Sequence, residues 1–158
     1  MEHMKKYEYF MDGIFRRGKK LPEEVTQLGE VLSEFINSNT PPEWLVDTIE
    51  HHPKDKKHTD NISLYIIENS LVGTRDKFIG LYYNPRTDLV QFIILPKEKQ
   101  ELINIQDFLE KILTPFNTQS KEFQNELIEG RRFWIKLNNI ISITKSITDQ
   151  NLDKFLNK

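Results

Sequence analysis

The chain has 158 residues, 37% of them hydrophobic and 29% charged, with a net charge of −2, a pI near 6.1 and no cysteine. This length fits one domain with its own core, and the missing cysteine excludes disulfides, thiolate metal sites and thiol nucleophiles. Without an apolar run of about 18 residues or a signal-like start, we expect one domain over residues 1–158 in the cytoplasm, with no membrane contact.

The first predicted elements are a hairpin and a helix. Residues 7–17 alternate around Asp12-Gly13, a favoured two-residue turn, which predicts a β-hairpin. Pro22 suits the start of a helix because the first turn does not need its missing N–H. From Val25 to Ile36 the apolar residues recur at spacings of three and four, which predicts one amphipathic helix.

A second helix is predicted directly after the first. Thr40 to Glu43 has the pattern of a capping box, in which the side-chain oxygen of each of these two residues accepts a hydrogen bond from the backbone N–H of the other. We expect this helix to turn Trp44, Leu45 and Ile49 inward and to end near residue 52, before a proline.

From residue 62 the apolar period changes to two, which indicates strands. Segments 62–67, 77–83 and 89–95 are each typical of a strand, and the last two flank the turn sequence 84–88. Short connections of this kind join antiparallel neighbours, so we expect a three-stranded meander.

The C-terminal third predicts a helix, a second hairpin and a last short helix. Asn104 has the position of an N-cap for a helix through Thr114, and Thr148 that of a cap for a helix with Leu152, Phe155 and Leu156 inward. Segments 131–137 and 140–144 flank a tight turn, whereas 123–128 fits either strand or helix. The predicted fold class is α+β: an antiparallel β-meander plus a second hairpin, packed against about four helices.

Motifs for catalysis and cofactors are missing. The six glycines are scattered, so no glycine-rich loop can hold phosphates, and no Gly-x-Ser-x-Gly elbow occurs. We therefore expect no cofactor and favour binding over catalysis.

One weak metal candidate is the polar loop that carries His51, His58 and Asp60. Imidazole and carboxylate suit Zn²⁺, which would make the protein a metal-dependent hydrolase. Lysines in the same loop oppose a cation, and the spacing matches no known ligand pattern, so a solvated loop is the simpler interpretation.

A basic and aromatic segment offers a second binding hypothesis. If Arg131 to Lys136 is a strand, Arg132, Trp134 and Lys136 share one face, where the ring can stack on a base and the cations can hold phosphate. The predicted basic set for nucleic-acid binding is Arg131, Arg132, Trp134 and Lys136. The alternative is an amphipathic strand whose outward tryptophan is covered by a helix or stacked on by an arginine. The low pI argues against nucleic acid as the partner.

The charge pattern gives the leading hypothesis. Residues 21–50 hold seven acids and no lysine or arginine, so the rest of the chain carries a net +5. We expect an acidic two-helix face that docks a basic partner, such as a nuclease or nucleic-acid-binding enzyme. The protein would then be a non-catalytic inhibitor, immunity protein or antitoxin of a bacterium or phage, unless cations of the same chain neutralise the face. Its partner-binding residues would be Glu23, Glu30, Glu34, Glu43, Asp47 and Glu50.

Overall fold

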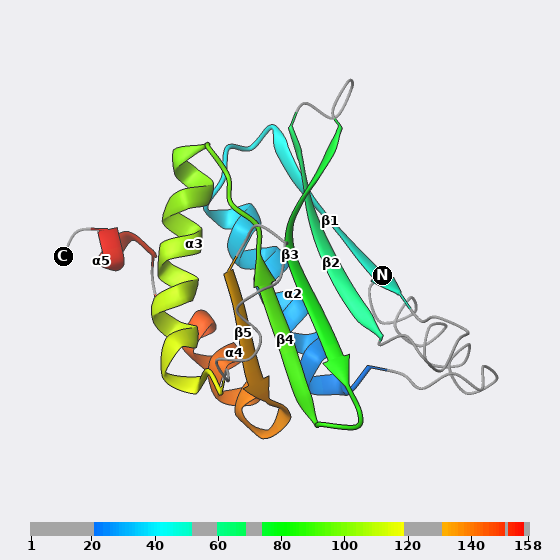
Figure 1. The fold of residues 1–158 in the computed structure, drawn as a ribbon. Helices are drawn as coiled ribbons and strands as arrows, with labels where there is room; N and C mark the ends of the chain where they lie inside the picture. The colour runs from blue at the N-terminus through cyan, green and yellow to red at the C-terminus, as the bar shows by residue number, and fades with distance from the viewer. Residues whose placement is uncertain (1–20, 52–59, 69–73, 119–130, 151, 157–158) are drawn as a thin grey trace.

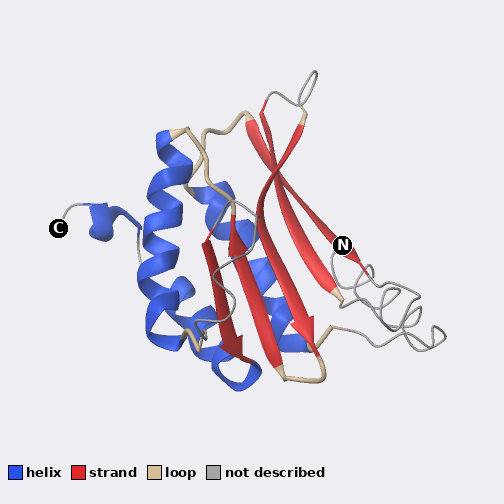
Figure 2. Ribbon diagram, in the orientation of Figure 1, coloured by secondary structure: helices blue, strands red, loops and turns tan. Residues whose placement is uncertain are grey.

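The computed structural model describes residues 21–51, 60–68, 74–118, 131–150 and 152–156. These residues form one antiparallel sheet with helices packed on one of its faces (Figure 1, Figure 2). The predicted hairpin at 7–17, the segment 123–128 and residues 52–59 of the polar loop lie outside the described residues.

The sheet has five strands, and every neighbouring pair is antiparallel. Its spatial order follows the chain, so each strand lies beside the strand that precedes it. The predicted meander is confirmed as the three central strands, and one further strand extends the sheet at each end. The strands are β1 (Trp44–His51), β2 (Asn61–Glu68), β3 (Arg75–Asn84), β4 (Leu89–Ile94) and β5 (Arg131–Lys136).

Three longer helices and one short helix are described. They are α2 (Glu23–Ser38), α3 (Gln100–Leu113), α4 (Ile140–Asp149) and α5 (Leu152–Leu156), with 3₁₀ turns η1 (Thr114–Phe116) and η3 (Leu137–Asn139). Helix α2 packs on β1, β2 and α4, and α3 packs on α4 and α5. None of these helices has both the length and the apolar character that crossing a membrane requires.

Helix α2 confirms the first predicted helix. Its apolar stripe, which includes Val25, Leu28, Leu32 and Ile36, is fully buried against the sheet. The chain contains no alanine, the best helix former, so this buried stripe is the main source of the helix's stability.

The second predicted helix is wrong, because residues 44–51 form strand β1 and pair with β2 along their whole length. The Thr40 hydroxyl donates to the Ile36 carbonyl at 2.9 Å, so it closes the end of α2 instead of opening a new helix. The valine, threonine and isoleucine within β1 favour extended backbone. Pairing with a central strand outweighs the local capping pattern.

The second predicted hairpin is also wrong in its second half. Strand β5 pairs with β4, and the segment after it forms α4 instead of a returning strand. Ile140, Ile143 and Ile147 are buried at spacings of three and four, which is the stripe of a helix. The two asparagines before Ile140 lie in η3, which leads directly into α4.

The remaining helix boundaries differ from the prediction at their caps. Helix α3 begins at Gln100, whose side-chain amide donates to Asn104 Oδ1 at 2.8 Å, so Asn104 lies inside the helix and does not cap it. Thr148 similarly lies inside α4. The short last helix is confirmed as α5, with Leu152 buried as predicted and Leu156 47% exposed.

The core lies between the helices and one face of the sheet. Phe78 and Phe92 from the sheet and Phe108 from α3 are fully buried. Phe108 stacks on Phe35 of α2, with ring centroids 5.0 Å apart, and meets Phe155 of α5 edge-on at 5.6 Å. The described helices therefore cover one face of the sheet. The candidate site lies on the opposite face.

Candidate functional site

The strand register assigns each strand residue to one of two faces. Successive side chains alternate between faces, and directly opposite residues point the same way. Leu64 opposite Ile79 and Phe92 opposite Phe133 mark the helix-covered face, because all four are buried. We name the other face the helix-free face, because no described helix packs on it. It carries Leu45, Asp47, Ile49, His51, Asn61, Ser63, Tyr65, Ile67, Arg75, Lys77, Gly80, Tyr82, Asn84, Leu89, Gln91, Ile93, Arg132, Trp134 and Lys136.

Two rings and an amide form a line across the helix-free face. Tyr82, Gln91 and Trp134 stand directly opposite one another on β3, β4 and β5, and we name them the aromatic row. Neighbouring strands lie about 4.8 Å apart, so the two rings start from backbone positions about 10 Å apart with the amide between them. All three side chains are partly exposed. The row therefore offers two aromatic surfaces and one hydrogen-bonding group.

Lys77 and Gly80 hold the Tyr82 ring against the sheet. The Lys77 ammonium donates to the Tyr82 hydroxyl at 2.6 Å and lies 5.1 Å from the ring centroid, within cation–π range. A Cβ at Gly80 would come within 2.7 Å of Tyr82 Cε1, so only glycine leaves space for the ring in this position. The orientation of the ring is thus fixed before any ligand arrives.

Strand β5 supplies the other end of the aromatic row. Arg132 and Lys136 share the face of Trp134, as the sequence predicts for a strand. The Trp134 backbone is fixed on its outer side: its N–H donates to Asn117 Oδ1 at 3.0 Å, and its carbonyl accepts from the Thr118 N–H at 2.7 Å.

Arg131, the fourth residue of the predicted basic set, points to the helix-covered face. Its Nη1 donates to Glu110 Oε2 of α3 at 2.6 Å, and the Glu110 side chain is only 13% exposed. Burial raises the pKa of Glu110 above its usual value, and the nearby Arg131 guanidinium partly opposes this effect. Glu110 Oε1 is buried without a hydrogen-bond partner in the described structure, which agrees with desolvation as the main cause. Arg131 is therefore paired with a carboxylate of the same chain and does not belong to the helix-free face.

The helix-free face has a positive charge balance. Among its described residues it carries four cations, namely Arg75, Lys77, Arg132 and Lys136, against the single carboxylate of Asp47. That carboxylate pairs with Arg75 at 2.9 Å. In a chain with net charge −2, the fold thus collects an excess of cations around the aromatic row.

The predicted acidic residues are not brought into one two-helix face. Glu23, Glu30 and Glu34 are exposed on α2, on the opposite side of the sheet from the helix-free face. Glu43 is exposed just before β1. The three α2 glutamates are the part of the predicted surface that still lies together.

The two acids of β1 point to opposite faces. Asp47 shares the helix-free face with Arg75, whereas Glu50 stands opposite Ile62 and so lies on the helix-covered side. The alternation of a strand separates residues that a helix would have placed on one surface. The expectation of two acidic helices is therefore wrong, and Asp47 is neutralised within the chain.

The polar loop gives no described metal centre. His51 is exposed at the end of β1, Asp60 precedes β2, and His58 lies outside the described residues. Within the described part of the chain, no group of three or more histidine or carboxylate side chains is placed to hold a metal ion.

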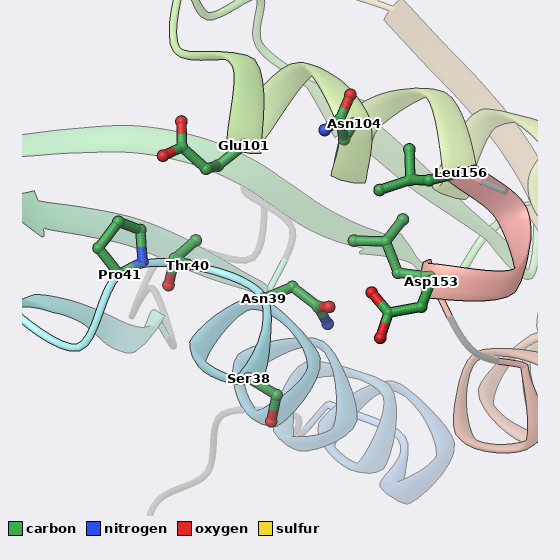
Figure 3. Close-up of a pocket in the computed structure, with 9 residues that line it drawn as sticks. Ser38, Asn39, Thr40, Pro41, Glu101, Asn104, Asp153 and Leu156 are labelled. Carbon is green, nitrogen blue, oxygen red and sulfur yellow. The ribbon is translucent and has the colours of Figure 1, made fainter.

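A shallow cleft of about 360 Å³ lies between the end of α2, the start of α3 and α5 (Figure 3). Glu101 and Asp153 contribute carboxylates, and the rest of the lining is polar or aliphatic. Asn39 and Thr40 use their side chains to bond the last carbonyls of α2. With no cation in its lining, this cleft is not an extension of the basic surface.

Sequence reasoning missed Lys77, Tyr82 and Gln91. Each lies on a strand that was predicted correctly, and the period-two alternation of those strands was the available signal. The alignment of Tyr82 and Gln91 with Trp134 depends on β5 pairing with β4, across a connection that contains α3.

Comparisons with protein-family models, curated proteins and solved structures find no match to this chain.

Proposed function

We propose that the protein binds single-stranded nucleic acid on the helix-free face of its sheet. The observation that carries the proposal is the register that aligns Tyr82 and Trp134 on one face, with Lys77, Arg132 and Lys136 beside them. Bases stack on such rings with about 1–3 kcal/mol each, and cations along the same surface attract the phosphates.

A single strand fits this surface better than a duplex does. The rings of the aromatic row rise from a sheet, which offers a broad surface instead of a helix that enters a groove. Unpaired bases can turn outward and lie on the rings, whereas paired bases remain stacked on one another.

The low pI of the whole chain argued against nucleic acid as the partner, but the pI reflects the summed charge of two different surfaces. Four of the seven acids of residues 21–50 lie on α2, on the other side of the sheet from the helix-free face where the cations named above gather. A phosphate backbone responds to the local charge balance because salt screens charges beyond about 8 Å at physiological ionic strength.

Anisotropy of fluorescein-labelled dT12 and rU12, measured from 50 to 300 mM salt, tests the proposal. Trp134→Leu should weaken binding about 5- to 150-fold, because it removes one stacking surface. Lys136→Gln should lower the slope of log K against log salt by about 0.7, the value for one phosphate contact on a single strand. Lys145→Gln, an exposed change on α4, is the matched control and should change neither quantity.

The proposal fails if the wild-type protein binds neither strand at 50 mM salt. It also fails if Lys145→Gln and Lys136→Gln change the salt slope equally, because the binding would then follow net charge and not this face. Circular dichroism of each variant checks that the fold is retained.

A second candidate function is the docking of a basic protein on α2. It is supported by the three exposed glutamates on that helix and by the absence of lysine and arginine from residues 21–50. For a partner captured from the host, Glu30→Lys with Glu34→Lys should slow association and flatten its salt dependence. An unchanged association rate contradicts this candidate.

A further inference from the structure

The amide of Gln91 is placed to contact a base held by the aromatic row. Gln91 lies at the centre of the row, directly opposite Tyr82 on one side and Trp134 on the other. A base that stacks on either ring would lie beside this side chain, since the strands are only about 4.8 Å apart.

The hydrogen-bonding groups of Gln91 are not used within the described structure. Other amide side chains have partners there: Asn117 accepts from the Trp134 backbone, and Gln100 donates to Asn104. Gln91 is partly buried on its face, and no described residue bonds its side chain. The amide is therefore available to bond a ligand in place of water.

We infer that Gln91 recognises a base edge, with adenine as the preferred base, on the nucleic-acid strand proposed above. A carboxamide has one acceptor and one donor group side by side, which matches the amino group and ring nitrogen of adenine. Cytosine and thymine present one donor beside one acceptor on their Watson–Crick edge only, whereas adenine presents such a pair on two edges, so adenine can pair with Gln91 in more orientations. This inference rests on the proposed function and names the base that the same site selects.

The test compares dT12 with two strands of equal length whose two central residues are adenine or cytosine. Wild-type protein should bind the adenine strand more tightly than dT12, by up to about 150-fold, the upper limit for one good bidentate contact. Gln91→Leu should remove this preference and keep the slope of log K against log salt, because no phosphate contact is lost. The RNA counterparts of the three strands show whether the preference extends to both sugars.

Gln91→Glu gives an independent check with nearly the same shape. A carboxylate still accepts from the amino group of adenine but cannot donate to its ring nitrogen, so Gln91→Glu should lose the adenine preference as Gln91→Leu does. The inference is overturned if the wild-type protein binds all three strands equally, or if Gln91→Leu keeps the adenine preference. Failure of the proposed function looks different, because no strand then binds at 50 mM salt.

Discussion

At the scale of single residues, the ion pair between Glu110 and Arg131 links α3 to the start of β5. One carboxylate oxygen accepts from Arg131, while the other is buried without a described hydrogen-bond partner. The folded protein thus holds a proton on Glu110 at a pH where the unfolded chain has released it, because burial raises the pKa of this carboxyl.

The free energy of unfolding should therefore fall as pH rises from the unfolded pKa of Glu110 through its raised folded pKa. Glu110→Gln removes the titrating group, so this part of the pH dependence should disappear. At pH 7 the variant should be at least as stable as wild type, with a gain below about 1 kcal/mol. Urea denaturation at pH 4.5 and pH 7 measures both effects, and Glu101→Gln, at a carboxylate outside this ion pair, serves as control. A variant with the same pH dependence as wild type would contradict the argument.

Residue-level prediction from the sequence was correct where a single strand decides the result. Arg132, Trp134 and Lys136 share a face because alternation alone requires it. Gln91 and Tyr82 could not be added, because their alignment with Trp134 depends on which strands pair and in which register. That information is not present in any one segment of the chain.

At the scale of elements, Gly29 marks the close contact between α2 and β2. A Cβ at this buried position would lie 3.1 Å from Ile62 Cδ1, which is closer than most carbon contacts. Glycine costs a helix interior about 1 kcal/mol relative to alanine, so the sequence gives up helix propensity to allow this approach.

Gly29→Ala should stabilise the protein by about 1 kcal/mol when Ile62→Val has already removed the Cδ1 atom. In the wild-type background the same change should give a smaller gain, because the new methyl group meets Ile62. A double-mutant cycle by chemical denaturation measures the difference. Additive effects of the two substitutions would show that the contact does not limit position 29.

The elements that the sequence predicted wrongly share one cause. A capping pattern stands before β1 and a two-asparagine turn stands before α4. In both places tertiary contacts override the structure that the local signal favours. β1 gains a full ladder with β2, and α4 buries an isoleucine stripe between α2 and α3. Elements with long apolar periodicity, such as α2 and the central strands, were predicted correctly because burial and local preference agree there.

At the scale of the whole molecule, the fold turns the uneven charge distribution of the sequence into two separate surfaces. The α2 glutamates and the cations of the helix-free face lie on opposite sides of the sheet. A helix is about 10–12 Å in diameter, so the two surfaces are more than one Debye length apart at physiological salt.

Neutralising the α2 surface should therefore have little effect on nucleic-acid binding at physiological salt. The triple variant Glu23→Gln, Glu30→Gln and Glu34→Gln should change the affinity for dT12 by less than about twofold at 150 mM salt. At 10 mM salt, where the Debye length reaches about 30 Å, it should bind more tightly than wild type. Lys136→Gln should weaken binding at both concentrations, and a large gain for the triple variant at 150 mM would contradict this charge separation.

The position of β1 at the end of the strand order has a consequence for self-association. An edge strand offers backbone groups to any further strand, including that of a second copy, and charged side chains discourage such growth. β1 carries the Asp47–Arg75 ion pair on one face and the Glu50 carboxylate on the other, so a second strand at this edge of the described sheet would have to pack beside charged groups on both faces. The charged side chains of this strand thus disfavour sheet growth between neighbouring copies, whether or not a partner docks on α2.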